Sequence, residues 1–278
     1  MSRLPIDDVL PDVVSAVRAA GRVVVQAPPG AGKTTKIPLA LLQAGSVPGR
    51  IIMLEPRRVA ARAAAERMAQ TLGEPVGHTV GYRIRGDSKV GPATRIEVVT
   101  EGILTRMVQD DPDLPGVGAV IFDEFHERSL NADLGLALCL EVREALRPDL
   151  VLIVMSATLD AAPVARLMGD APVVTSEGRS FPVETRWRAR PQKLSRHERL
   201  ALATETVERA LAEEEGSILV FLPGAGEIRD VARRLQDARA DVLPLYGALP
   251  FAEQRRAIAP TPDRKVVLAT AIAETSLT

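Results

Sequence analysis

The sequence contains little of several residue types, and each shortage excludes a class of protein. One cysteine, Cys139, occurs in 278 residues, so neither a disulfide framework nor a multi-cysteine metal site can form. Aromatic residues make up 3% of the chain, too few for a sheet surface covered by base-stacking rings. No apolar run reaches the roughly 18 residues of a membrane span, and the acidic, proline-containing N-terminal segment is unlike a signal peptide. We therefore expect a soluble, cytoplasmic protein.

The charge balance excludes an evenly basic surface. The chain has 35 Lys and Arg against 36 Asp and Glu, a formal net charge of −1. Any binding of nucleic acid must then depend on local residues. Hydrophobic residues make up 46% and charged residues 26%, which is typical of a folded chain. At about 150 residues per domain, the length suits two domains.

Short apolar runs alternate with longer segments of helical periodicity along the chain. Strands that are apolar on both faces and separated by helices are typical of a parallel sheet covered on both sides. The pattern therefore predicts an α/β fold. In the first part of the chain, the runs that we expect to be strands are Val23–Gln26, Ile51–Leu54, Ile96–Thr100, Ala119–Phe122, Leu150–Met155 and Val173–Thr175.

A polar, glycine-containing segment, Ser176–Ser180, is a plausible linker. The alternation then begins again, with Phe181–Trp187 as its first predicted strand. We expect two α/β domains, residues 1–176 and residues 177–278. Val266–Thr270 has the pattern of a buried strand and only eight residues follow it, so we expect the second domain to be incomplete.

A glycine- and proline-rich turn connects the first predicted strand to a predicted helix. Its letters, APPGAGKTT at 27–35, match a P-loop except that Ala27 replaces the first glycine. Backbone N–H groups of such a turn, at a helix N-terminus, form a cradle for an anion. Lys33 would reach the β- and γ-phosphates of ATP, and the Thr34 hydroxyl would bind Mg²⁺. The alternative is an incidental turn. The predicted nucleotide-binding residues of the turn are Pro29, Gly30, Ala31, Gly32, Lys33, Thr34 and Thr35.

Two carboxylates, Asp123 and Glu124, end the apolar strand Ala119–Phe122. Ligands of a parallel sheet bind at the carboxyl ends of its strands. Asp123 is placed to hold Mg²⁺ through water, and Glu124 to ligate the metal and to orient or deprotonate an attacking water. A solvated acidic strand end is the alternative. Together with the P-loop, the pair predicts a nucleoside triphosphatase without saying how the energy is used.

Three further polar residues follow predicted strands. His126 lies on the loop that leaves the acidic pair, where it could be structural or could sense the phosphates. Ser156 and Thr158, in the letters SAT, follow the strand Leu150–Met155. Their hydroxyls could cap a helix, or they could link hydrolysis to the second domain.

The ordered motifs resemble those of DEAH/RHA-type superfamily 2 helicases, most closely the bacterial HrpB-type branch. The resemblance covers almost the whole chain, and the Phe125 of DEFH, where alanine is commoner in the family, is typical of that branch. It implies two RecA-like P-loop NTPase domains with parallel sheets. ATP and Mg²⁺ would bind between them, and single-stranded RNA, or DNA, would cross both. The motifs are APPGAGKTT (27–35), EPRRVAA (55–61), TEGIL (100–104), DEFHERS (123–129), SAT (156–158), LVFLPGAGEI (219–228) and LATAIAETSLT (268–278).

The resemblance also implies contacts with the nucleic acid and with the base of the nucleotide. Arginine and backbone N–H groups bind phosphates without reading sequence. Arg67 would stack on the base, although a salt-bridged helix arginine is an alternative. For Arg57 and Arg58 the alternative is a solvated basic turn. We expect Phe221 to lie in the core. The implied nucleic-acid contacts are Arg57, Arg58, Thr100, Glu101, Gly102, Thr270 and Thr275.

The main hypothesis is an ATP-dependent RNA helicase. In it, Lys33, Thr34 and the acidic pair carry the chemistry, while His126, Ser156 and Thr158 couple it to motion. A nucleotide-dependent binding or scaffold module without turnover is the alternative. A P-loop kinase or metabolic ATPase is disfavoured, because it has no use for a second RecA-like unit. The family's arginine-finger motif is absent from this sequence, so we expect slow hydrolysis and no unwinding by this chain alone.

Overall fold

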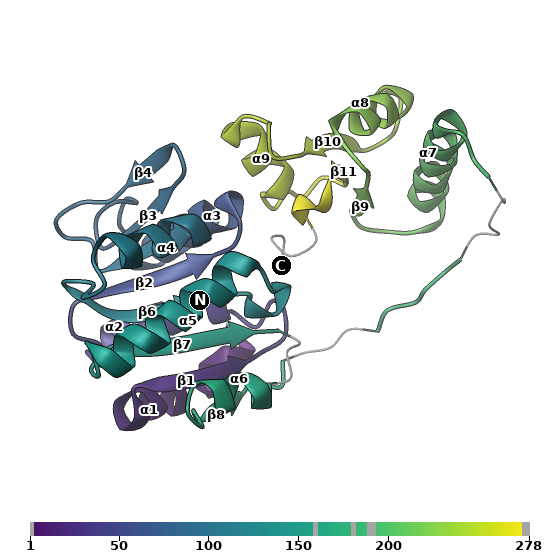
Figure 1. Ribbon diagram of the computed structural model, residues 1–278. Helices are drawn as coiled ribbons and strands as arrows, with labels where there is room; N and C mark the ends of the chain where they lie inside the picture. The colour runs from purple at the N-terminus through teal and green to yellow at the C-terminus, as the bar shows by residue number, and fades with distance from the viewer. Residues whose placement is uncertain (1–2, 158–160, 179–181, 188–192, 274–278) are drawn as a thin grey trace. The chain divides into compact units, whose positions relative to one another are not determined.

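The computed structural model describes residues 3–157, 161–178, 182–187 and 193–273. The chain divides into two compact units, Met1–Pro182 and Val183–Thr278. Both units are built from strands and helices (Figure 1), so the predicted α/β class is confirmed. Thr158 and Thr275, two of the predicted site residues, lie outside the described residues.

The first unit contains an eight-stranded sheet in the order β4-β3-β5-β2-β6-β7-β1-β8. Every pairing is parallel except that of β3 with β4, which is antiparallel. The six predicted strands are present, whereas the β3–β4 hairpin was not anticipated. The strands are β1 Arg22–Gln26, β2 Arg50–Glu55, β3 Val80–Ile84, β4 Asp87–Lys89, β5 Ile96–Thr100, β6 Val117–Phe122, β7 Val151–Ser156 and β8 Val173–Thr175.

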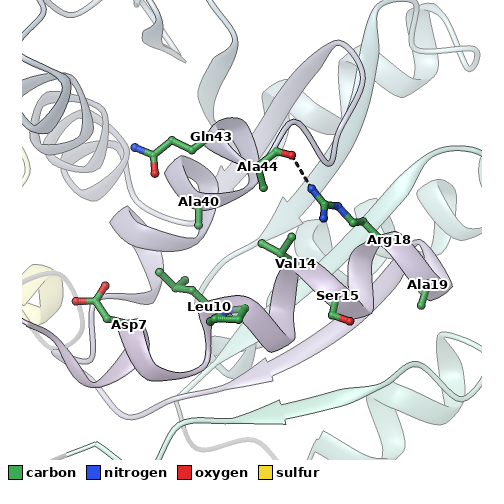
Figure 2. A pocket seen from close by; sticks show the side chains of 10 residues that line it. Asp7, Leu10, Val14, Ser15, Arg18, Ala19, Ala40, Gln43 and Ala44 are labelled. Atoms are coloured by element: carbon green, nitrogen blue, oxygen red, sulfur yellow. Dashed lines mark hydrogen bonds between the residues drawn. The ribbon is translucent and has the colours of Figure 1, made fainter.

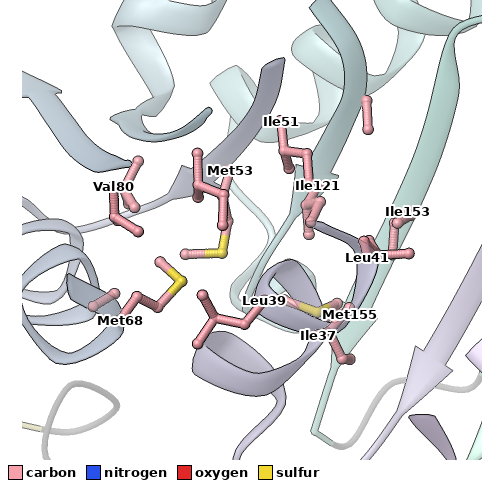
Figure 3. Packing of buried hydrophobic residues seen from close by; sticks show 14 of the residues in the cluster. Ile37, Leu39, Leu41, Ile51, Met53, Met68, Val80, Ile121, Ile153 and Met155 are labelled. Carbon is pink, nitrogen blue, oxygen red and sulfur yellow. The ribbon is translucent and has the colours of Figure 1, made fainter. Parts of the chain in front are cut away.

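Helices cover both faces of this sheet. Alternate residues of a strand point to opposite faces, so Val23 and Val25 belong to one core cluster and Val24 to the other. Figure 3 shows part of the first cluster, where Leu39 and Met68 lie near Met53. The helices are α1 Leu10–Ala20, α2 Lys33–Gln43, α3 Arg58–Leu72, α4 Glu101–Asp110, α5 Leu130–Ala145 and α6 Ala161–Leu167, with short 3₁₀ turns η1 Pro5–Asp8 and η2 Phe125–Glu127.

Helices α1 and α2 are neighbours and border a shallow surface groove (Figure 2). Arg18, from the last turn of α1, donates from Nη2 to the carbonyl of Ala44 at 2.7 Å. Ala44 directly follows the last residue of α2, and carbonyl groups at a helix end have no partner within their own helix. The arginine therefore closes the C-terminal end of the helix whose first residue is Lys33.

The second unit has a smaller, wholly parallel sheet in the order β10-β11-β9. Its central strand, β11, is almost entirely buried. Two core clusters pack on its opposite faces, one containing Val266 and Leu268 and the other Val267 and Ala269. The elements are α7 Arg196–Glu213, β9 Ile218–Phe221, α8 Ala225–Arg234, β10 Asp241–Leu245, α9 Phe251–Ile258, β11 Lys265–Ala269 and the 3₁₀ turn η3 Ala271–Ala273.

Two sequence-based expectations for this region are wrong. The predicted strand at 181–187 is not formed, since residues 182–187 are irregular. Phe221 is not a core residue, because its side chain is 51% exposed. It lies on β9, whose Ile218 and Val220 pack on one cluster while Leu219 and Phe221 occupy the opposite, exposed face. The apolar run was read as buried on both faces, but β9 is covered on one.

Candidate nucleotide and nucleic-acid site

The turn between β1 and α2 adopts a backbone that needs glycine. Gly30 has φ 76° and Gly32 has φ 94°, both in the left-handed region that residues with a side chain rarely adopt. Pro29 and Gly30 are exposed at the tip, whereas Ala31 is buried. Gly32 precedes α2 and supplies no side-chain cap to the helix. The N-terminal turn of α2, which begins at Lys33, is thus open to an anion.

Neighbouring strands fix the start of this turn. Gln26, the last residue of β1, is in register with Ser156, the last residue of β7. The Ala27 N–H donates to the Ser156 carbonyl at 3.0 Å, and the Ser176 N–H donates to the Gln26 carbonyl at 2.8 Å. Ser156 itself is 1% exposed. The letters SAT therefore begin directly beside the P-loop, at the carboxyl edge of the sheet.

Lys33 and Glu124 meet at this edge. Lys33 Nζ lies 2.7 Å from Glu124 Oε1, and the two side chains are 4% and 15% exposed. Glu124 has φ 49°, an uncommon conformation for a residue with a side chain. Its N–H donates to Asp123 Oδ1 at 2.8 Å. The structure thus brings the P-loop lysine and the acidic pair into one site.

Asp123 fits a magnesium ligand. It is 2% exposed, and its buried Oδ2 accepts no hydrogen bond from an N–H or hydroxyl group of the described residues, while the neighbouring Glu55 carboxyl can donate to Asp123 when it is protonated. Buried polar oxygens are normally paired, and Mg²⁺ prefers oxygen ligands that it shares with phosphates and water. Thr34 lies in the first turn of α2, half-buried. No group of three His, Cys, Asp or Glu residues suited to a metal occurs in the described part of the chain, and a phosphate-shared magnesium requires none.

Glu55 belongs to this site, although its place in the sequence predicts no role for it. It ends β2, next to the strand that carries Asp123, and is 3% exposed. Burial, and then the charge of Asp123, raise the pKa of Glu55 well above its usual value. Burial, followed by Asp123, also raises the pKa of Glu124, against the opposing effect of Lys33. The only sequence signal for Glu55 is a carboxylate at the end of an apolar strand.

His126 connects the acidic pair to the end of β7. Its Nδ1 lies 3.3 Å from Glu124 Oε2 and accepts a hydrogen bond from the Ala157 N–H at 3.4 Å. The same ring nitrogen therefore lies between the Ala157 N–H and the Glu124 carboxylate. The predicted motifs DEFH and SAT therefore touch each other in the first unit.

The predicted nucleic-acid residues of the first unit lie along the same sheet edge. Thr100, the last residue of β5, is in register with Glu55 of β2. Arg57 follows β2, and its Nη2 lies 3.4 Å from Glu127 Oε2. Ser129 Oγ donates to Glu101 Oε1 at 2.6 Å, so the Glu101 carboxylate already has a partner. A phosphate at this turn would then be bound by backbone N–H groups. Arg58 and Gly102 are exposed.

Two predicted residues lie away from the Lys33–Glu124 contact. Arg67 lines a pocket together with Thr35, Lys36 and Gln70, on the side where α2 faces α3. Thr270 belongs to the second unit, where it follows β11 and its N–H donates to the Leu245 carbonyl at 3.1 Å. The structure therefore places Arg67 beside the P-loop helix and Thr270 at a strand end of the smaller sheet.

A P-loop and an acidic pair that meet at one edge of a parallel sheet define a P-loop nucleoside triphosphatase. The DEAD/DEAH box helicase family model matches residues 10–167, and the chain belongs to this family. No helix within the described residues is long and apolar enough to cross a membrane.

Two relatives and one solved structure illustrate the similarity. The chain is 55% identical to the ATP-dependent RNA helicase HrpB of Escherichia coli K12, covering 100% of this chain and 35% of that protein. It is 37% identical to the ATP-dependent RNA helicase HrpA of the same strain, over 99% of this chain and 22% of the relative. The crystal structure of the E. coli DEAH/RHA helicase HrpB matches with a TM-score of 0.91 at 53% identity, covering 99% of this chain and 35% of that one. The chain thus spans about a third or less of the length of these relatives.

Proposed function

We propose that this chain is the motor region of an ATP-dependent RNA helicase. Residues 1–176 and 177–278 form its two RecA-like domains, which use ATP and Mg²⁺ to move along single-stranded RNA. One observation carries the proposal: Lys33 Nζ lies 2.7 Å from Glu124 Oε1, next to the buried carboxylate of Asp123. The names of the relatives supply the choice of RNA.

The residues of the first unit divide the work of hydrolysis between them. Phosphate oxygens of ATP compete with Glu124 for the Lys33 ammonium group, which separates the two side chains. Glu124 then orients water and accepts a proton from it as the oxygen attacks the γ-phosphorus and ADP leaves. Thr34 and Asp123 would hold Mg²⁺, which when bound neutralises charge on the phosphates. Residues 29–35 cradle the phosphates, and Arg67 stacks on the base.

His126 and the end of β7 couple hydrolysis to movement. His126 contacts both Glu124 and the Ala157 N–H. A movement of Glu124 would therefore shift His126 and, with it, the backbone between Ser156 and Thr158. In the proposal this backbone transmits the state of the nucleotide to the second domain.

Single-stranded RNA is held through its phosphates. Arg57 and Arg58 supply positive charge at the entrance to α3. Thr100, Glu101 and Gly102 supply backbone N–H groups at the start of α4. Thr270 and Thr275 make the corresponding contacts in the second domain. No base is read by these groups, so the grip is independent of sequence.

The test is ATP hydrolysis by the 278-residue chain, alone and with poly(U) or poly(dT). Because the arginine-finger motif is absent from this sequence, we expect slow hydrolysis, which poly(U) stimulates more than poly(dT) does. Glu124→Gln should lower the rate by about 10²–10⁴-fold, the usual contribution of a general base, while nucleotide binding persists. Glu141→Gln changes an exposed glutamate on α5 and is the matched control. The proposal fails if Glu124→Gln hydrolyses ATP as fast as the Glu141→Gln control.

A further inference from the structure

Two glutamates of one short segment hold two cationic side chains. Glu124 pairs with Lys33, the predicted phosphate ligand. Glu127, three residues later, pairs with Arg57, the predicted nucleic-acid ligand, at 3.4 Å, and these two side chains are 19% and 25% exposed. Glu124 directly precedes the 3₁₀ turn η2, which includes His126 and ends at Glu127. One turn of chain therefore contacts the groups that would bind each of the two proposed ligands.

The backbone of this turn is tightly constrained. Glu124 and Arg128, on either side of η2, both have positive φ, 49° and 45°. Residues in such conformations persist only where their surroundings hold them, and they are concentrated at functional sites. The Glu127 N–H donates to the Glu124 carbonyl at 2.9 Å. Arg128, the residue after Glu127, donates from Nε and Nη2 to the Asp133 carboxylate, and these bonds attach the end of the turn to α5. A displacement of Glu127 is thereby passed to Glu124 rather than absorbed by a loose loop.

The pairing of Glu127 with Arg57 is incomplete. Glu127 Oε2 faces the arginine, whereas Oε1 is buried without a hydrogen-bond partner in the described part of the chain. Partly exposed ion pairs of this kind contribute little to stability. A phosphate group can engage a guanidinium through two parallel hydrogen bonds, which is a stronger arrangement than the 3.4 Å contact with Glu127. A phosphate can therefore compete with the Glu127 carboxylate for Arg57.

We propose that Glu127 is a positioning residue that competes with a nucleic-acid phosphate for Arg57, so that arriving nucleic acid releases Glu127 from the arginine. The inference rests on the proposed function of Arg57. Release frees the far end of the turn whose near end holds Lys33 through Glu124. Binding of nucleic acid at Arg57 would thus affect Glu127 and, through the turn, the hydrolytic carboxylate of Glu124.

The test measures the binding of fluorescein-labelled oligo(U) to the 278-residue chain by fluorescence anisotropy. Glu127→Gln keeps the shape of the side chain and removes the competing charge. It should tighten binding by about 3- to 5-fold, the range expected for losing a partly exposed ion pair. Arg57→Gln should weaken binding. In the Arg57→Gln background, Glu127→Gln should no longer have an effect, because the arginine for which it competes is absent.

Glu141→Gln, which removes one exposed carboxylate from α5, controls for the change in net charge and should leave binding unaltered. A Glu127→Gln variant that merely damaged the turn would bind RNA more weakly, which overturns the inference. Equal tightening with and without Arg57 also overturns it, since the effect would then be a general charge effect. If the unaltered chain does not bind, or if Arg57→Gln has no effect, the proposed role of Arg57 fails and the inference fails with it. Loss of binding in Arg57→Gln with no gain in Glu127→Gln overturns the inference alone.

Discussion

The left-handed backbone conformation, rather than a shortage of space for a side chain, explains why glycine stands at position 30. At position 32 a side chain would also meet Leu4. A Cβ at Gly30 would meet no atom within 4 Å, yet φ is 76°. At Gly32 a Cβ would come 2.6 Å from the Cδ1 of Leu4, the far end of a flexible side chain. The two glycines let the chain reverse between β1 and α2 while the N-terminus of α2 stays open.

Gly30→Ala should lower the free energy of unfolding of the first unit by about 1–2 kcal/mol, because an alanine is strained in the left-handed region. Gly102→Ala is the matched control. Gly102 lies in α4 with open space around it, so alanine there should raise stability by about 0.5–1 kcal/mol. Hydrogen exchange of the buried β6 amides reports both free energies. Equal protection in the two variants would contradict the argument.

Among the elements, the hairpin of β3 and β4 is attached to α3 by a three-residue cluster. The Tyr82 hydroxyl donates to Asp87 Oδ2 at 2.9 Å. Arg62 of α3 pairs with the same carboxylate, and its guanidinium carbon lies 5.4 Å from the centre of the Tyr82 ring. The cluster holds an edge of the sheet against the helix that begins with the predicted RNA contacts. Its geometry depends on Asp87 being ionised.

Asp87→Asn should reduce thermal stability in a pH-dependent way. The hydrogen bond from Tyr82, helped by Arg62 against the effect of burial, lowers the pKa of Asp87. The stabilisation is therefore fully present above the ordinary aspartate pKa and is lost as the pH falls through the lowered native value. The difference in melting temperature between the unaltered chain and the variant should be largest at neutral pH and shrink below about pH 4.

Melting curves of the two proteins from acid to neutral pH measure this dependence. Asp110→Asn, which changes an exposed carboxylate at the end of α4, provides the comparison. A gap between the unaltered chain and Asp87→Asn that widened toward acid pH would reverse the predicted sign.

At the scale of the whole molecule, the net charge of −1 leaves no general attraction for a polyanion. Binding of RNA must then come from a few phosphate contacts at the strand ends. Each contact releases condensed counterions, so affinity should fall steeply with salt.

The logarithm of the oligo(U) association constant should fall linearly with the logarithm of salt concentration, measured by anisotropy between about 50 and 200 mM. Arg57→Gln should reduce the steepness by about 0.7, the value for one lost phosphate contact on a single strand. An unchanged slope together with weaker binding would show that Arg57 acts without touching a phosphate.

The sequence predicted β1, β2, β5, β6 and β7 because these strands are almost wholly buried and read as largely apolar runs. It also predicted the short edge strand β8, although its residues are largely exposed. It missed β3, in which Gly81 and Arg83 interrupt the apolar run. It did not predict β4, whose three residues, Asp87–Lys89, are all polar and depend on pairing with β3. The prediction that Phe221 is buried was wrong because an apolar run does not reveal that one face of its strand is uncovered.

Most contacts between residues far apart in the sequence could not be predicted from the spacing of the motifs. Edge position alone indicated that the P-loop and the acidic pair would approach each other. Nothing in the letters indicated that Arg57 would meet Glu127, 70 positions away, or that Glu55 would be buried beside Asp123. Such contacts depend on the strand order, which the apolar pattern does not specify.

The strand order places β6 between two groups of neighbours, with β2 and β5 on one side and β7 and β1 on the other. Residues proposed to touch RNA follow the first group, and those proposed to touch phosphates of ATP follow the second. Substitutions on the RNA-binding flank can therefore change which polynucleotide is preferred while the residues of ATP hydrolysis on the other flank stay unchanged. The short acidic stretch after β6 contacts both flanks, Lys33 through Glu124 and Arg57 through Glu127, so a substitution there should disturb both functions together.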